Sequence, residues 1–153
     1  MTVKFKAVVI DNQNEKFTRE IKEIDNSHLK DGNVLIKIDF SSLNYKDALI
    51  LKDGGKIVRK FPFVPGIDFS GKVIESSDDK FKKDEDVICT GFRVGEMYYG
   101  GFSQYAKVDS NFLIKNPKDI DSEKSMMLGT AGFTALQCSF AIKAREELLL
   151  GEK

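Results

Sequence analysis

The side chains that most often bind metals or act as nucleophiles are scarce in this chain of 153 residues, which contains two cysteines and one histidine. Cys89 and Cys138 lie far apart in the sequence and form no C-x-x-C pair, so they predict neither a disulfide framework nor a zinc site. We interpret both as buried small hydrophobic residues. His28 stands alone in a polar stretch and is expected to be solvated. The residues themselves therefore predict no metal site.

Two other places combine polar side chains with a predicted helix start. In residues 44–47 (NYKD) an amide, a phenol and a carboxyl group follow closely on one another. Asn44 fits a helix N-cap, and Asp47 fits the electrostatics of a first helical turn. In residues 129–134 (GTAGFT) the hydroxyl groups of Thr130 and Thr134 lie at a glycine-rich helix opening. They fit packing of that opening as well as they fit a ligand held by hydroxyl and backbone N–H groups.

The first half of the chain has the pattern of strands with one short helix. Residues 3–9 alternate between apolar and polar positions and meet Asp11-Asn12, which predicts a strand and then a turn. A turn is expected at residues 30–33 (KDGN), before the clearest half-buried strand at residues 34–41. The helix is expected from residue 44 to residue 51, ended by residues 53–55 (DGG). Its predicted apolar side consists of Ala48, Leu49 and Leu51.

The second half continues with strands and then becomes helical. Strands are expected around residues 69–75, 86–90 and 100–108. Asp121 is the expected N-cap of a helix that is interrupted from Gly129 to Gly132 and followed by a longer helix over residues 133–149. This order predicts a mainly β fold with α-helices (α+β), in which a β-rich barrel or sandwich passes into a helical connector.

Charge and composition limit the partners. Lys plus Arg and Asp plus Glu number 24 each, and 41% of the residues are hydrophobic. A balanced chain of this kind has no broad attraction for nucleic acid or anionic lipid. No apolar stretch approaches the roughly 18 residues of a membrane span, and the N-terminus lacks the apolar region of a signal peptide. We expect a cytoplasmic, globular protein without nucleic-acid or membrane partners.

Four blocks follow one another at a characteristic spacing: residues 41–48 (SSLNYKDA), 63–73 (FVPGIDFSGKV), 95–106 (GE and then GGFSQYA) and 129–135 (GTAGFTA). Together they resemble the N-terminal GroES-like domain of medium-chain dehydrogenases/reductases, in the acrylyl-CoA reductase branch of the quinone-oxidoreductase-like enzymes. The resemblance spans residues 5–141. It implies a GroES-like, partly open β-barrel with short helices over residues 1–120. Residues 121–153 would then be a connector to a nucleotide-binding domain outside this chain.

The resemblance also implies a site without zinc. Zinc alcohol dehydrogenases of this superfamily carry a Cys where Asn44 stands and a His-Glu pair where Ile67 and Asp68 stand. Catalytic zinc needs about three N, S or O protein ligands, and Ile67 supplies none. Without this Lewis acid, hydride addition to an activated C=C bond is easier than alcohol oxidation, because the conjugated carbonyl takes up the charge.

The resemblance therefore implies an NADPH-dependent reductase of acrylyl-CoA or a related 2-enoyl thioester, enone or quinone, with homo-oligomeric full-length relatives. It assigns catalytic roles to Tyr45 and Asn44, and cofactor contacts to Tyr45, Thr130 and Thr134. For Tyr45 the alternative is an amphipathic tyrosine at a helix start. No G-x-G-x-x-G fingerprint is present, so this chain by itself is expected to be inactive. The alternative function is a non-catalytic GroES-like module for binding or oligomerisation.

Overall fold

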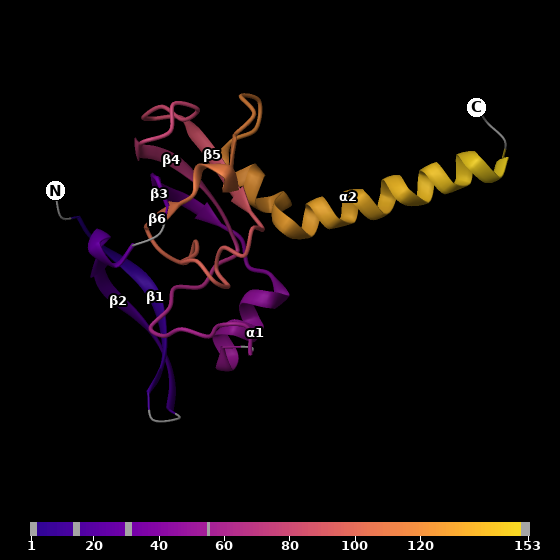
Figure 1. The fold of residues 1–153 in the computed structure, drawn as a ribbon. Coiled ribbons are helices and arrows are strands. Elements are labelled where there is room, and N and C mark those ends of the chain that lie inside the picture. Colours follow the sequence, from indigo (N-terminus) through magenta and orange to yellow (C-terminus); the bar gives the residue numbers. More distant parts are fainter. Residues whose placement is uncertain (1–2, 14–15, 30–31, 55, 151–153) are drawn as a thin grey trace.

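The computed structural model describes residues 3–13, 16–29, 32–54 and 56–150, with the side chains of residues 147–150 excepted. Within these ranges the chain forms two antiparallel sheets and two α-helices (Figure 1). The elements are β1 (Lys4–Gln13), β2 (Lys16–Asp25), β3 (Val34–Ser41), α1 (Tyr45–Asp53), β4 (Asp68–Ser76), β5 (Asp86–Thr90), β6 (Tyr105–Val108), β7 (Leu113–Lys115) and α2 (Ser122–Leu150), with short 3-10 helices at Asn26–His28 and Ser110–Phe112. The predicted α+β class is confirmed, and in the described part of the chain the sheets do not close into a barrel.

The larger sheet has the strand order β6-β3-β4-β5-β7, and β4 is its central strand. The alternation predicted for β3 is confirmed at its start, where Val34 and Ile36 are fully buried against Phe69 and Val73 of β4. Gly71 lets β3 and β4 approach closely, because a Cβ atom there would lie 2.1 Å from the carbonyl oxygen of Lys37. The central strand is thereby fixed tightly in the sheet, and its first residues are held in place for the site described below.

The smaller sheet is a long hairpin of β1 and β2. The turn predicted at Asp11-Asn12 is wrong, because β1 continues to Gln13 and Asp11 pairs with Thr18. β2 was not predicted at all. None of its residues is buried, so burial imposes no alternation of apolar and polar residues on the sequence there. Backbone hydrogen bonds to the neighbouring strand define β2 instead.

The helix predicted near residue 44 is confirmed as α1, and Gly54 ends it in a left-handed conformation with φ of 80°. Its predicted apolar side is right only in part: the half-buried Leu51 packs against a core cluster, but Ala48 is exposed. The buried residues of the helix are Asp47 and Ile50. A buried carboxylate was not anticipated on the inner face of a short helix. Of the other predicted turn and terminal positions, residues 30, 31, 55 and 151–153 lie outside the described residues.

Helix α2 begins as predicted, since the carboxylate of Asp121 accepts a hydrogen bond of 2.8 Å from the Lys124 backbone N–H. The predicted interruption is shorter than expected: only Gly129 leaves helical geometry (φ 48°, ψ −157°), and Gly132 lies inside the continuing helix. After this kink α2 projects away from both sheets (Figure 1). Its large side chains are exposed there, including Phe133 at 60% and Phe140 at 66%.

By length and composition alone, residues 122–146 of α2 are apolar enough to cross a membrane, contrary to our expectation of no such stretch. No charged residue lies between Lys124 and Lys143, although glycine, serine, threonine and glutamine interrupt the apolar residues. Only 17% of the most apolar window is buried. A single helix of this kind is weak evidence for a membrane span, since a helix that packs on another domain has the same composition.

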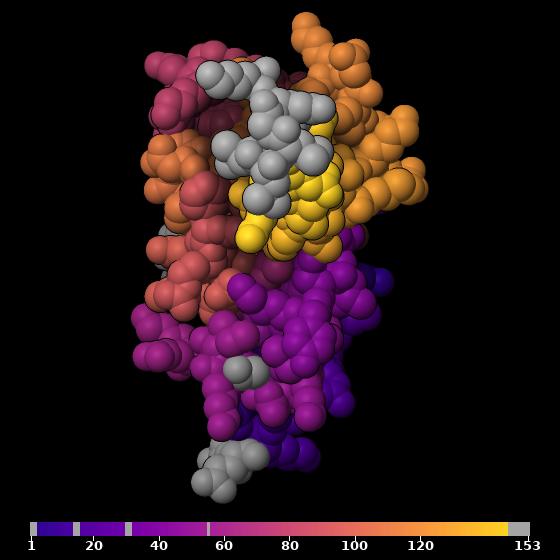
Figure 2. Space-filling view, turned by 90° about the vertical axis from the view of Figure 1, so that its right-hand side faces the viewer, coloured from indigo at the N-terminus to yellow at the C-terminus, as the bar shows by residue number. Residues whose placement is uncertain are grey.

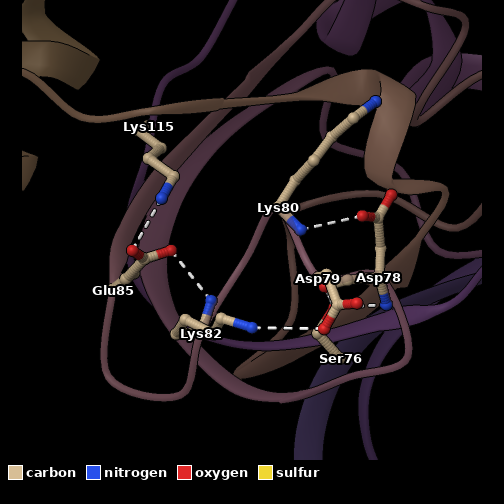
Figure 3. Close-up of polar contacts among 7 residues, drawn as sticks. All are labelled: Ser76, Asp78, Asp79, Lys80, Lys82, Glu85 and Lys115. Atoms are coloured by element: carbon tan, nitrogen blue, oxygen red, sulfur yellow. Dashed lines mark hydrogen bonds and ion pairs between the residues drawn. The ribbon is translucent and has the colours of Figure 1, made fainter.

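The turn that joins β4 to β5 carries a chain of exposed charges (Figure 3). Glu85 accepts hydrogen bonds from Lys115 Nζ at 2.7 Å and from the Lys82 backbone N–H at 2.8 Å. Asp78 accepts one from the Lys80 backbone N–H at 2.9 Å. These contacts close the turn at the end of β4 that lies opposite Asp68.

Candidate functional site

Three segments that are distant in the sequence meet at the carboxylate of Asp68, the first residue of β4. Its Oδ2 atom accepts hydrogen bonds from Ser42 Oγ (2.9 Å), Asn44 Nδ2 (2.9 Å) and the Thr130 backbone N–H (2.8 Å). Its Oδ1 atom accepts one from Thr130 Oγ1 at 2.6 Å. Asp68 is completely buried. One carboxylate thus ties the loop before α1, the central strand and the kink of α2 together.

The local sequence at the kink explains this geometry. At Gly129 a Cβ atom would lie 2.8 Å from Asp68 Oδ2 and 2.9 Å from Ser42 Oγ, in a backbone conformation that L-residues rarely adopt. The kink also takes the N–H of Thr130 out of the helical hydrogen-bond ladder. A helix start with free N–H groups favours a negative charge, and Asp68 supplies it from within the domain.

A second buried carboxylate, Asp47, fixes the start of α1. It accepts hydrogen bonds from the backbone N–H groups of Asn44 (2.8 Å) and Ile67 (3.0 Å). Burial raises the pKa of Asp47 above the ordinary 3.8, the two backbone N–H groups oppose this rise, and the charge of Asp68 adds to it. The neighbouring cation, Lys46, points elsewhere and pairs with Glu96 at 2.8 Å. Backbone and side-chain dipoles therefore stabilise these two carboxylates.

The structure brings together only some of the residues predicted for the site. Asn44 and Thr130 meet at Asp68, and both donor groups of Thr130 are used there. Tyr45 is 80% exposed, and its hydroxyl forms no hydrogen bond with the described residues. Thr134 is exposed on α2 and donates its hydroxyl to the Thr130 carbonyl oxygen at 2.9 Å. The roles predicted for these four residues remain predictions.

Tyr45 is the best placed of them to reach a ligand. On the face shown in Figure 2, the purple and magenta atoms of α1 lie below the projecting α2. Leu43, at 72% exposure, and Met127, at 74%, add apolar surface to the same two segments. A planar, partly apolar ring such as a nicotinamide suits such a surface, with the free hydroxyl of Tyr45 as a donor to its amide. Thr134 keeps acceptor lone pairs on its oxygen for the same purpose.

Sequence reasoning missed the residues that organise this site. Asp68 was noted only as the residue at the Glu position of the zinc enzymes, Gly129 only as the start of a helix interruption, and Ser42 received no role. A signal was present, because Asp68 is the only charged residue between Lys60 and Lys72, in a mostly apolar stretch where an ionised side chain needs buried partners. The identity of those partners depends on tertiary contacts with residues 42–44 and 129–130.

The positions that the resemblance equates with zinc ligands contain hydrogen-bonded groups instead. Asn44 and Asp68 contact each other directly at 2.9 Å, and the aliphatic side chain of Ile67 is buried beside them. Among the described residues no cluster of three or more His, Cys, Asp or Glu side chains exists. One carboxylate and one amide do not make the donor set that zinc prefers. That the protein works without zinc remains a prediction.

The cysteines play no visible part in the site. Burial raises the pKa of the Cys89 thiol to about 12, and the charge of Asp68 adds to this effect, so Cys89 is a neutral thiol at physiological pH. It packs in the core of the larger sheet, as predicted. Cys138 is exposed on α2, so the prediction that it is buried is wrong.

Several solved structures and sequences of known proteins resemble this chain closely. A probable acrylyl-CoA reductase (AcuI) of Escherichia coli is 42% identical over 137 residues, which make up 90% of this chain and 42% of that protein. An acrylyl-CoA reductase (AcuI) of Ruegeria pomeroyi is 42% identical over 141 residues. The crystal structure of E. coli YhdH with bound NADPH superposes with a TM-score of 0.86 at 41% identity and covers 90% of this chain and 43% of that one. The chain thus spans less than half the length of these relatives.

Another similar structure contains NAD in place of NADPH. The structure of Bacillus subtilis YhfP with bound NAD has a TM-score of 0.87 at 35% identity and covers 93% of this chain. The sequence profile of the alcohol dehydrogenase GroES-like domain matches residues 30–118, more than half of the chain. That stretch contains β3 to β7 and includes Asn44, Tyr45 and Asp68. The chain therefore belongs to the alcohol dehydrogenase GroES-like domain family.

Proposed function

We propose that this chain is the substrate-side domain of an NADPH-dependent, zinc-independent reductase that transfers hydride to a C=C bond conjugated with a carbonyl group. Two relatives with about the same similarity over this region are named acrylyl-CoA reductases, and the YhdH structure contains NADPH. In this proposal residues 1–120 form the substrate domain. Residues 121–153 lead into a nucleotide-binding domain.

The observation that carries the proposal is the exposed Tyr45 hydroxyl on a rigidly held backbone. Tyr45 is the first residue of α1, and the residue before it is fixed by hydrogen bonds to both Asp47 and Asp68. Tyr45 itself is 80% exposed, and the preceding Asn44 shares its partner Asp68 with Thr130 at the α2 kink. A donor that is held in place before the substrate arrives stabilises a developing charge most effectively.

The chemistry requires little more than this donor. A nicotinamide held at Tyr45 and Thr134 would supply the hydride to the β-carbon of the substrate, and the carbonyl oxygen would take up the negative charge as an enolate. Tyr45 donates a hydrogen bond to that oxygen. Water or a hydroxyl group then protonates the α-carbon. Asn44 acts in this scheme as a positioning residue, because its side-chain N–H groups are directed to Ser42 (3.3 Å) and Asp68 (2.9 Å).

The test is a chimaera that joins this chain to the nucleotide-binding part of the E. coli relative. We expect NADPH oxidation that depends on acrylyl-CoA. Tyr45→Phe should lower kcat/KM by about 10- to 1,000-fold, the effect of losing one hydrogen bond to a developing oxyanion. Tyr98→Phe is the matched control, since Tyr98 packs on Phe112 with a ring-centroid distance of 5.4 Å. It should leave the kinetics unchanged.

Three outcomes would count against the proposal or against the role that it gives to Tyr45. A folded chimaera that binds NADPH but reduces neither acrylyl-CoA nor a quinone would favour a non-catalytic binding module. Wild-type kinetics for Tyr45→Phe, with only a lower melting temperature, would give Tyr45 a packing role. A loss confined to the KM for NADPH would place the hydroxyl on the cofactor instead of the substrate.

A further inference from the structure

A hollow of about 280 Å³ lies between the segment after α1 and the loop that follows β5. Its wall contains four apolar side chains: the buried Val58 and Phe63, the half-buried Ile57, and Met97, which is 56% exposed. An apolar wall of this kind favours a ligand with a hydrocarbon or amide chain over a bare ion. The hollow is part of the surface beside the candidate site, because the Lys46–Glu96 ion pair connects it to the first turn of α1.

The rim of the same hollow is positively charged. Arg59, Lys60 and Arg93 line it, together with a single carboxylate, Glu96. The side chain of Glu96 is only 13% exposed and is already paired with Lys46 at 2.8 Å, with Arg93 at a longer 3.8 Å. Neither Arg59 nor Lys60 forms an ion pair within the described ranges of the chain. In a protein with a formal net charge of zero, this is a local excess of positive charge around an apolar wall.

The loop that presents Arg93 adopts a costly backbone. Gly91, Phe92 and Arg93 have φ values of 84°, 51° and 62°, so two successive L-residues occupy the left-handed region. Phe92 is held by stacking on Phe112 at 5.2 Å, and the Arg93 carbonyl oxygen accepts the Met97 N–H at 2.9 Å. Such conformations persist where surrounding contacts determine them, and they are concentrated at ligand-binding sites. Here the strained turn directs a cation to the rim of the hollow.

A larger hollow, of about 820 Å³, offers a contrast on the other side of the molecule. It is lined by residues of β4, β5, β7 and the start of α2. Two of its three lysines are already paired, Lys72 with Asp86 at 2.6 Å and Lys115 with Glu85 at 2.7 Å. Its lining also contains seven acidic residues: Asp39, Asp84, Glu85, Asp86, Asp119, Asp121 and Glu123. The lining of the larger hollow is therefore mainly acidic and does not favour an anionic ligand. The rim of the smaller hollow is mainly cationic and does favour one.

From these features we propose that the hollow at Arg59, Lys60 and Arg93 binds the phosphorylated end of the thioester substrate. A coenzyme A thioester combines an uncharged reacting end, an amide-containing chain and phosphate groups, which match in turn the site at Tyr45, the apolar wall and the cationic rim. A quinone or simple enone has no group for the rim. This inference rests on the proposed function and selects phosphate-bearing thioesters among its substrate classes.

The test is a titration of the 153-residue chain, which requires no turnover. Propionyl-CoA, the saturated product of acrylyl-CoA reduction, is compared by calorimetry with propionyl-pantetheine, which lacks the phosphates and the adenosine, and with NADPH. We expect propionyl-CoA to bind at least about tenfold more tightly than propionyl-pantetheine, and more weakly as NaCl is added. The Arg59→Gln/Lys60→Gln double variant should remove that difference. Lys37→Gln/Lys107→Gln, which makes the same change of charge on the larger sheet, should retain it.

The other outcomes overturn the inference. Equal affinity for the two thioesters would show that the phosphates are not recognised. If both double variants lost the preference for propionyl-CoA equally, the preference would depend on the net charge of the protein and not on the hollow. Tighter, competitive binding of NADPH would assign the rim to the phosphates of the cofactor. Failure of the proposed function is distinguishable, because an inactive chimaera leaves these titrations unaffected. If the chimaera is active but propionyl-CoA binds equally well without Arg59 and Lys60, only the role of the hollow is refuted and the proposed function stands.

Discussion

Strand β4 has carboxylates near both of its ends, and their surroundings are opposite. At its start, Asp68 is fully buried and accepts four hydrogen bonds from three side chains and one backbone N–H. Beyond its end, Asp79 and Glu85 lie in the solvent-exposed turn of Figure 3 and pair with lysines. The exposed contacts involve full opposite charges, whereas the buried ones involve neutral donors.

The comparison shows that the number of charges in a network is a poor guide to its importance. Water competes for exposed ion pairs and salt screens them, so their net contribution to stability is small. A buried carboxylate has no such competitor, and each donor that it loses leaves a polar group without a partner. The start of β4, at Asp68, should therefore contribute more to stability than the exposed turn beyond its end, and it also holds the candidate site in place.

The largest expected effect is that of Asp68→Asn. The amide can keep only one of the two oxygen acceptors, so its NH₂ group faces Thr130 Oγ1 or the three donors around Oδ2. We expect a loss of about 3 kcal/mol in the free energy of unfolding, or roughly 6–12 °C in Tm. Urea denaturation followed by circular dichroism measures it. Asp79→Asn in the exposed turn is the control, and equal losses in both variants would remove the distinction between the two ends.

The next largest effect is expected at the kink. In Gly129→Ala the new methyl group meets Asp68 Oδ2 at 2.8 Å in a conformation with φ of 48°. The expected cost is about 1–3 kcal/mol for the backbone alone. Gly132→Ala is the matched control three residues later, where the nearest neighbour is the flexible side chain of Leu128 at 3.3 Å and the backbone is helical. It should be neutral or stabilising by up to about 1 kcal/mol, and a similar loss in both variants would contradict a special role for Gly129.

The sequence predicted this region only in part. Blocks of sequence located the β3 strand, the short helix at residue 45 and the N-cap at Asp121, because each depends on local pattern or capping chemistry. They also pointed to Asn44 and Thr130 as polar residues of interest. The hydrogen bonds from both to Asp68 bridge 24 and 62 positions of sequence, and local pattern carries no information about such contacts.

Two other errors have the same origin. β2 is a strand whose exposed residues show no alternation, and it exists because β1 offers a partner along its whole length. Asp47 was assigned to helix-terminal electrostatics, which accounts for its bond to the Asn44 N–H. Its burial was not foreseen, because it follows from the packing of residue 67 against the helix start.

A third prediction uses pH to separate the buried and exposed carboxylates. The pKa of Asp47 is raised above 3.8 by burial, so its contribution is most favourable at low pH and is lost as the pH rises through that raised pKa. The pKa of Glu85 is lowered below 4.5, first by the hydrogen bond from Lys115. Its contribution is therefore present above 4.5 and is lost as the pH falls through the lowered value.

Urea midpoints measured across this range should show the opposite signs. On acidification, Glu85→Gln should lose less stability than the wild type, and Asp47→Asn should lose more. Asp47→Asn should also be less stable at every pH, because one of its two backbone N–H donors loses its acceptor. Chloride is held constant so that screening does not change along the series. Parallel curves for all three proteins would show that neither carboxylate titrates differently in the folded and unfolded states.

The smallest effect is expected at the most conspicuous contact of Figure 3, the ion pair between Lys115 and Glu85 at 2.7 Å. Both side chains are partly exposed, at 55% and 30%, so water can replace each partner and the pair gains little over its solvated groups. Lys115→Gln at neutral pH should change Tm by no more than about 1–2 °C, and 0.5 M NaCl should erase even that difference. Adding the same salt to Asp68→Asn should leave its deficit intact, because screening by mobile ions does not reach a fully buried carboxylate. A salt-resistant loss of several degrees in Lys115→Gln would mean that the exposed turn, and not the buried network, fixes β4 in the sheet.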